Sequence, residues 1–167
     1  MPLVTRIGLN VASTYSTTGD LSTVRTIPWA YEKIISLASG VGLNQADKLF
    51  VDQRTVTTGA IDSLDLAGGG LLDVDGAPFA PARIKGLILF AATANTTILS
   101  LTRPANGVPF LGASGDLVTA HAGSLIMLAW PSAAGIVVTA ATGDLIDIVN
   151  AAGASAVYDI AIWGASA

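Results

Sequence analysis

Apolar and polar residues along this chain follow the two-residue period of β-strands. Gly and Pro recur roughly every 8 to 15 residues, and the segments between them are rich in Val, Ile, Leu and Thr, which is typical of an all-β domain. The pattern predicts strands at residues 3–13, 31–38, 48–56, 61–66, 83–92, 97–102, 124–130, 136–139, 145–150 and 156–163.

One segment fits two structures. Residues 28–39, PWAYEKIISLAS, fit a helix in which Pro28 occupies the first turn. They also fit a strand in which Tyr31 and Leu37 share one face. Because the turn-like SGVG follows and another predicted strand comes directly after it, we expect a strand.

Two predicted strands are apolar on both faces. In a β-sandwich each strand has one buried and one solvated face, and LIDIVN (145–150) alternates as that arrangement requires. GLILFAA (86–92) and SLIMLAW (124–130) do not alternate. A domain of this size has one inner layer, so we expect the second faces to meet another subunit or another protein. Loops or the N-terminal segment of the same chain are the alternative cover.

These patterns predict an antiparallel β-sandwich with an N-terminal arm or edge strand. The Ser/Thr-rich, weakly patterned residues 1–26 are expected to form the arm or edge strand, and residues 27–167 the sandwich. A single continuous domain over residues 1–167 is the alternative, since a chain of this length is sized for one domain.

Charged residues are scarce. They make up 12% of the chain, against about 25% in ordinary soluble domains. Such a chain is either embedded in a membrane or covers its surface with other protein. Residues 117–143 carry no fixed charge, but the turn signature WPSAAG interrupts them, so two strands explain the segment better than a spanning helix. We therefore expect no membrane insertion.

The remaining composition excludes several classes of function. The net charge is −4 and the basic residues are scattered, whereas a nucleic-acid interface needs them on one face. Cysteine is absent, which rules out disulfides, thiolate metal sites and cysteine nucleophiles. The N-terminus has no uninterrupted apolar run, so we expect no signal peptide.

The step Gly-Asp-Leu occurs three times, with Asp20, Asp116 and Asp144 at its centre. Glycine supplies a bend, and aspartate bonds to its own neighbouring backbone in an Asx turn. Leucine then opens an apolar strand. We expect these aspartates to shape turns and to take no part in chemistry.

Residues 68–78, GGGLLDVDGAP, match part of a calcium-binding EF-hand loop through Asp73, Asp75 and Gly76. In that alignment Leu71 and Ala82 occupy the first and twelfth ligand positions, and neither can coordinate an ion. We expect a loop closed by an Asp-Gly turn and no metal site.

His121 is the single histidine, and with Ser114 it is the best candidate for a hydrolytic pair. The nucleophile elbow G-x-S-x-G is missing, since GASG at 112–115 is one residue short of it. Phosphate-binding loops of the P-loop type are also missing. We expect a loop histidine, no enzyme, and no catalytic or cofactor-binding residues.

Aromatic side chains offer one alternative. On a β-sandwich they can form a platform on which a sugar stacks, although they more often fill a core or an interface. The candidates are Trp29, Trp130, Trp163, Tyr15, Tyr31 and Tyr158.

From residue 44 onward the chain resembles a group of small β-rich structural proteins of tailed bacteriophages and prophages. The stretches that carry the resemblance are NQADKLFVDQRTV (44–56), DSLDLAGG (62–69), ARIKGLIL (82–89), NGVPF (106–110) and TGDLIDIVNAAGASAVYDIAIWGASA (142–167). The residues before Asn44 fit more loosely.

The resemblance implies a jelly-roll-like antiparallel sandwich and a virion structural protein assembled in the host cytoplasm. It favours a capsid decoration, or cement, protein that stabilises the head. The implied partners are further copies of the chain, with a trimer favoured, and the major capsid protein or another virion protein. It supplies no functional residues. A tail- or fibre-associated sandwich that binds a cell-surface carbohydrate is the alternative.

Overall fold

The computed structural model describes residues 2–18, 24–68 and 70–167, which form strands, turns and loops. Four strands belong to the first third of the chain: β1 (Thr5–Thr18), β2 (Val24–Ser39), β3 (Gln45–Ala46) and β4 (Lys48–Val56). The others are β5 (Ile61–Asp65), β6 (Arg83–Ala91), β7 (Leu99–Thr102), β8 (Leu117–Ala120), β9 (Leu125–Ala129), β10 (Ile136–Val137), β11 (Leu145–Asn150) and β12 (Ala156–Ala165).

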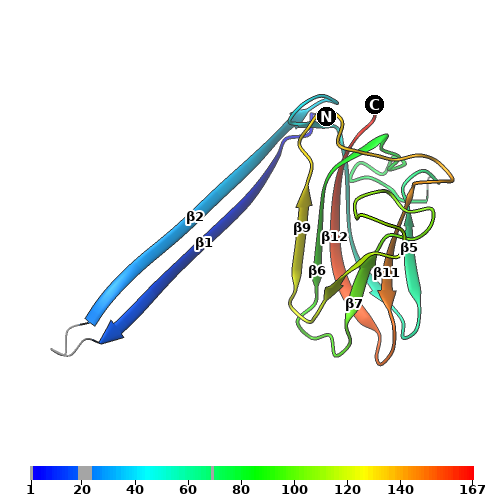
Figure 1. Ribbon diagram of the computed structural model, residues 1–167. Coiled ribbons are helices and arrows are strands. Elements are labelled where there is room, and N and C mark those ends of the chain that lie inside the picture. Colours follow the sequence, from blue (N-terminus) through cyan, green and yellow to red (C-terminus); the bar gives the residue numbers. More distant parts are fainter. Residues whose placement is uncertain (1, 19–23, 69) are drawn as a thin grey trace.

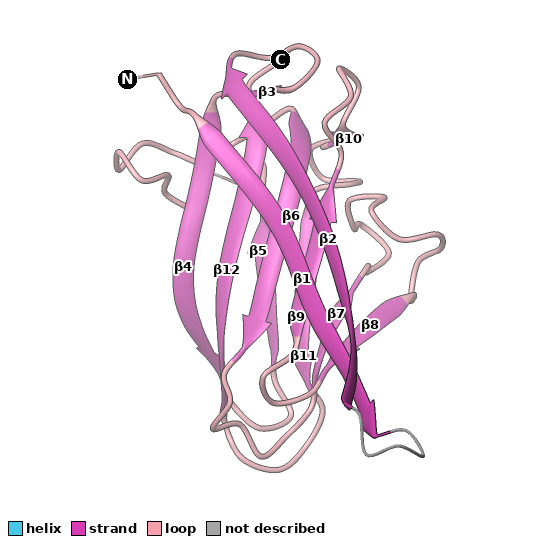
Figure 2. Cartoon of the chain, turned by 90° about the vertical axis from the view of Figure 1, so that its left-hand side faces the viewer, coloured by secondary structure: helices cyan, strands magenta, loops and turns pink. Residues whose placement is uncertain are grey.

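Two sheets pack face to face to form the body of the molecule (Figure 2). The five-stranded sheet has the order β10-β6-β12-β4, with β9 also paired to β6, and the four-stranded sheet has the order β5-β11-β7-β8. Within both sheets all pairs are antiparallel. The prediction of an antiparallel β-sandwich is therefore confirmed, while its jelly-roll topology stays a prediction.

The main core lies between the two inner faces. The alternation of β11 places Ile146 and Ile148 in this core, where they meet residues such as Leu87 and Leu89 of β6. Tyr158 of β12 is fully buried among them. Alternating apolar residues from two facing sheets fill the roughly 10 Å layer that such a sandwich encloses.

Most predicted strands lie where the pattern placed them, and β4 and β11 match their predicted bounds. The ambiguous residues 28–39 lie in a strand, as expected, and WPSAAG forms a loop between β9 and β10. The short strand β3 was not predicted, and β8 was missing from the predicted ranges, although the Gly-Asp-Leu pattern placed the start of a strand at Leu117. β3 has two residues, too few to show any alternation.

β1 and β2 form a long hairpin beside the sandwich, which we call the arm. Residues 27–39, assigned from the sequence to the sandwich domain, thus belong to β2 and pair with β1. Figure 1 shows the arm projecting away from the two sheets, attached at the end that carries the N-terminus. A parallel bridge between β2 and β3, Ala38 with Gln45 and Ser39 with Ala46, joins this end to the body.

The base of the arm covers part of the outer face of the five-stranded sheet. Ile7 of β1 and Leu37 of β2 form a second small core with Ala46 and Trp163. Residues of the doubly apolar strands β6 and β9, Ile88 and Met127 among them, pack against it on the side away from the main core. The chain therefore covers some of the second apolar face itself, at one end of the sheet.

Gly86 makes this close packing possible. A side chain at Gly86 would place its Cβ 3.2 Å from Cε3 of Trp163 and 3.5 Å from Cδ1 of Ile7. With glycine there, the indole ring and Ile7 pack directly on the backbone of β6. The sheet thus has a depression that receives the base of the arm.

Replacing Trp163 with alanine should remove the centre of this second core. We expect the free energy of unfolding to fall by roughly 3–5 kcal/mol, the usual range for deleting a buried aromatic side chain. Denaturant unfolding at a fixed protomer concentration measures the change. Leu72→Ala is the control, because Leu72 is 55% exposed and its loss should cost under about 0.5 kcal/mol. Equal losses in both variants would contradict the packing described above.

Candidate functional site: the projecting arm

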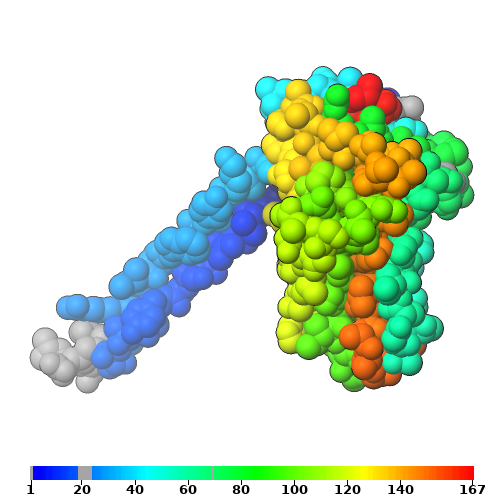
Figure 3. All heavy atoms as spheres, turned by 45° about the vertical axis from the view of Figure 1, so that its right-hand side comes forward, coloured from blue at the N-terminus to red at the C-terminus, as the bar shows by residue number. Residues whose placement is uncertain are grey.

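The arm is a continuous antiparallel ladder. Its register runs without a break from Thr5 opposite Leu37 to Thr18 opposite Val24. Fourteen residues of β1, at about 3.3 Å each, give a length of about 45 Å. Figure 3 shows most of this length standing clear of the sandwich in a space-filling view.

The two faces of the arm differ in chemistry. Residues directly opposite each other in an antiparallel pair share a face, and successive residues alternate. One face, which we call the apolar face of the arm, includes Ile7, Leu9, Val11, Tyr15, Ile27, Trp29, Tyr31, Ile35 and Leu37. The opposite face is mainly polar or small, with residues such as Arg6, Asn10, Thr14, Ala30, Glu32 and Ser36.

Burial of the apolar face falls steeply from base to tip. Leu37 is 1% exposed at the base, whereas Trp29 is 55% and Tyr15 is 65% exposed toward the tip. A two-stranded hairpin without further support is marginally stable at best in water. The distal arm therefore carries a row of large apolar side chains that the chain itself leaves uncovered.

The turn after β2 holds the base of the arm in one direction. The backbone N–H of Ala38 donates to the carbonyl of Asn44 (2.9 Å). The side-chain oxygen of Gln45 accepts from the N–H of Gly42 (2.8 Å) and fills the inside of this turn. The N–H of Asn44 in turn donates to the carbonyl of Pro131 in the β9–β10 loop (2.7 Å).

The side chain of Lys85 connects the turn after β2 with the β9–β10 loop. Its side chain is fully buried, and its Nζ donates to the carbonyls of Ser132 (2.6 Å), Ala133 (2.9 Å) and Gly42 (3.2 Å). Burial, and secondarily the charge of Arg83, lowers the pKa of Lys85 below its ordinary value. Three carbonyl acceptors compensate the ammonium group for its loss of water. Lys85 is therefore an internal clamp between the arm and the body.

The aspartates of the Gly-Asp-Leu steps shape turns where the structure describes them. Asp116 accepts from the N–H of Ala113 (2.6 Å) and Asp144 from the N–H of Ala141 (2.6 Å). Gly115 has the expected positive φ of 88°, but in the third step the positive φ falls on Ala141, at 65°. Asp20 lies outside the described residues.

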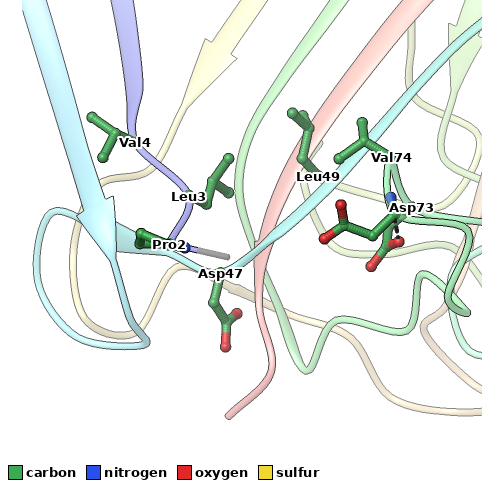
Figure 4. A pocket seen from close by; sticks show the side chains of 8 residues that line it. Pro2, Leu3, Val4, Asp47, Leu49, Asp73 and Val74 are labelled. Carbon is green, nitrogen blue, oxygen red and sulfur yellow. Dashed lines mark hydrogen bonds between the residues drawn. The ribbon is translucent and has the colours of Figure 1, made fainter.

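In the loop that resembles part of an EF-hand, the carboxylate of Asp73 accepts hydrogen bonds from the backbone of the loop itself. Oδ1 of Asp73 accepts from the N–H groups of Asp75 and Ala77, both at 3.0 Å, and Gly76 has a φ of 79°. The loop borders a cavity of about 240 Å³ beside the N-terminal segment (Figure 4). Asp47, on its other side, accepts from the backbone N–H of Ser166 (2.8 Å). Within the described ranges, no group of three or more His, Cys, Asp or Glu side chains could hold a metal ion.

The hydrolytic pair and the aromatic platform are not assembled as the sequence suggested. Ser114 and His121 are exposed, and no hydrogen bond joins them among those of the described residues. Trp163 is buried in the second core and Trp130 packs against the main core, so neither presents its ring to solvent as a platform would. Trp29 and Tyr31 do form an exposed pair, with ring centroids 6.4 Å apart and planes 9° from parallel.

A charged cluster closes one edge of the sandwich. Arg54 of β4 donates from Nε and Nη2 to both oxygens of Asp62 in β5 (2.7 and 2.8 Å), and the hydroxyl of Tyr158 donates to the same carboxylate (2.9 Å). Its bonds with Arg54 hold the pKa of Asp62 below the ordinary value. Burial, followed by the charge of Asp62, raises the pKa of Tyr158. The cluster ties the edge strands of the two sheets together.

Sequence reasoning missed the extent of the apolar face of the arm. It assigned residues 1–26 to an arm and the following strand to the body. The signal was present in the matching alternation of residues 7–15 and 27–37, with apolar side chains at every second position except Ser13 and Lys33. Pairing those two segments as one hairpin would have placed all these side chains on one face.

Replacing Lys85 with methionine should loosen the base of the arm. The change leaves three carbonyls without their donor, and an unsatisfied buried acceptor costs about 1–3 kcal/mol. We expect a loss of unfolding free energy of that order and faster hydrogen exchange at the N–H of Asn44. Lys48→Met is the control, because Lys48 makes only a 3.7 Å surface pair with Asp73. Unchanged exchange at Asn44 in Lys85→Met would contradict the clamp.

Replacing Asp62 with asparagine should make the stability of the protein less sensitive to acid. A depressed carboxyl pKa contributes stability that is present above the ordinary pKa of about 4 and is lost as the pH falls through the folded-state value. We expect Asp62→Asn to lower the free energy of unfolding by about 1–3 kcal/mol at pH 7, with a smaller deficit in strong acid. Urea unfolding at both pH values measures this. A deficit that does not shrink in acid would contradict the ionic role.

None of the family models, curated proteins or solved structures compared with the chain matches it. Among the residues that the structure describes, no helix is long and apolar enough to cross a membrane.

Proposed function

We propose that the protein is a structural subunit of a tailed-phage virion, a capsid decoration protein that stabilises the head through interfaces between subunits. The observation that carries the proposal is the distal apolar face of the arm. It exposes large side chains along most of a hairpin about 45 Å long. Contiguous exposed apolar surface of this kind marks an interaction site on a soluble protein.

The physical state of the arm supports an assembly role over a role in catalysis or ligand binding. Its distal part stands clear of the sandwich in Figures 1 and 3, and the hollow that β2 shares with the body lies toward the base, where Lys33, Ile35 and Pro131 help to line it. A hairpin on its own gains too little from burial to offset its conformational entropy. Contact with another protein would supply the missing burial, and the low charge of the chain, 12%, suits a surface covered by protein.

The virion setting rests on the resemblance of residues 44–167 to small structural proteins of tailed phages. In this proposal the sandwich has jelly-roll topology, and the subunits form a homotrimer that sits on the major capsid protein or another virion protein. Closed cyclic symmetry satisfies every arm in the assembly, because each arm finds a neighbour.

A carbohydrate-binding role in a tail or fibre is the second candidate, and one observation favours it. The rings of Trp29 and Tyr31 are exposed and nearly parallel, and aromatic faces of this kind can stack on sugars. Glycan-array screening separates the two candidates. A specific glycan whose binding is lost in Trp29→Ala would favour the carbohydrate role.

Making the apolar face of the arm polar should abolish self-association. We expect light scattering to show an oligomer, with a trimer favoured, for the wild type and a monomer for Ile27→Ser combined with Trp29→Ser. Thr26→Ser combined with Ala30→Ser is the matched control on the opposite face and should remain oligomeric. Co-sedimentation with heads of the phage or prophage that encodes the protein then tests decoration.

The outcomes separate the parts of the proposal. A monomeric wild type would contradict self-association through the arm. An oligomer that fails to sediment with heads would contradict the decoration role and leave self-association standing.

A further inference from the structure

We propose that the apolar face of the arm binds the outer face of the five-stranded sheet in a second copy of this chain. The inference rests on the proposed function, because it names the surface through which the subunits associate. It commits to a heterologous contact, in which the arm of one subunit meets the sheet of the next.

The outer face of the five-stranded sheet has one apolar row of residues and one row that is half apolar and half polar. The register places Val51, Ala161, Ile88 and Met127 side by side, and Gln53, Asp159, Phe90 and Leu125 in the adjacent row. The base of the arm covers the end of the sheet near Trp163. Away from that end, Val51 is 56% and Leu125 is 62% exposed. Val51, Phe90 and Leu125 thus form an apolar surface, bordered by Gln53 and Asp159, next to the part of the sheet that the arm already occupies.

The contact that we propose between subunits repeats one that the chain makes internally. Ile7 and Leu37 belong to the apolar face of the arm, and they pack on the outer face of the sheet at Trp163. The distal side chains Trp29 and Tyr31 continue the same face of the arm. Phe90 and Leu125 continue the same face of the sheet. The two uncovered surfaces are therefore extensions of the two sides of an existing interface.

Charge supports the pairing of these two surfaces. The charged residues on the apolar face of the arm are Arg25 and Lys33, both cationic. In the two rows of the sheet named above the charged residue is Asp159, an anion. Asp159 is exposed and accepts a hydrogen bond from Nε2 of Gln53 (2.8 Å). Among the described residues no ion pair is formed by Lys33, Arg25 or Asp159.

Charge also disfavours the two symmetric alternatives. Arms packed against one another would bring Lys33 and Arg25 of several subunits together, and sheets packed face to face would bring Asp159 toward its symmetry mate. Like charges placed opposite each other destabilise a contact. Arm against sheet avoids both and turns the cationic face of the arm toward Asp159, which lies beside Phe90 on the outer face of the sheet.

The arm cannot make the same contact with its own sheet as the structure stands. Lys85 and the β2–β3 bridge fix its base, and its distal part stands away from the body (Figure 3). A neighbouring subunit can approach the arm from the open side. A head-to-tail contact of this type closes into a ring when the rotation between subunits permits, as a trimer requires.

Cysteine cross-linking tests the contact directly, because the chain has no cysteine. Full-length variants with one cysteine each, Ser13→Cys or Thr17→Cys beside the large side chains on the apolar face of the arm and Gln53→Cys or Thr55→Cys on the outer face of the sheet, are mixed and treated with a short thiol cross-linker. We expect covalent dimers from arm-plus-sheet mixtures. Ala30→Cys, on the opposite face of the arm, is the control and should yield at least tenfold less dimer with the same sheet variants.

Charge reversal provides a second readout. Asp159→Lys should weaken self-association at least tenfold, as measured by sedimentation equilibrium, and Lys33→Glu in the same chain should restore it. Asp75→Lys makes the same change of charge at an exposed loop position and should leave the oligomer unchanged.

Three results would overturn the inference. Oligomers that cross-link arm to arm but never arm to sheet would show the wrong pairing of surfaces. Equal cross-linking from Ala30→Cys would show that the apolar face is not the contacting face. A monomeric wild type would overturn both the inference and the self-association in the proposed function, whereas arm-to-sheet cross-links without binding to phage heads would overturn the decoration role alone.

Discussion

The packing of Ile7 and Leu37 on Trp163, over the bare backbone of Gly86, is the contact on which the rest of the architecture depends. It gives a hairpin that could not persist alone a second hydrophobic core at one end. It also covers the end of a sheet face that would otherwise be apolar and exposed. Sandwich and arm are thus one structure, joined by a small core outside the main one.

The rigidity of that joint has a consequence for association. Lys85 holds the loops on both sides of the joint through three carbonyls, and the N–H of Asn44 adds a fourth bond between them. A binding element that is held in place before contact loses less conformational entropy on binding. The buried ammonium group is costly to desolvate, so its use here favours a fixed direction of the arm over a freely moving one.

The sequence predicted the positions of strands well where the local residue pattern alone determines them. Punctuation by Gly and Pro and the residue pattern between them located β4 and β11. The second apolar face of β6 and β9 is covered in part by the base of the arm, and its cover by another subunit stays a prediction. The extent of the arm was beyond this reasoning, because Trp29 and Tyr31 alternate in the same way whether a strand lies on a body or projects from it. The role of Lys85 was also invisible, since its three acceptors come from loops far apart in the chain.

A head-to-tail contact can lead to open filaments as well as closed rings, and the geometry at the base of the arm bears on which of them forms. Such contacts form closed rings at one angle between subunits and open filaments at others. In the assembly that we propose, that angle would follow from the direction in which the arm leaves its own sheet, and Gly86, Trp163 and Lys85 lie where the arm joins the sheet. Residues far from the proposed interface would therefore select the size of the assembly. In the proposed assembly, the internal core at the base of the arm would specify both the fold of one chain and the symmetry with which chains combine.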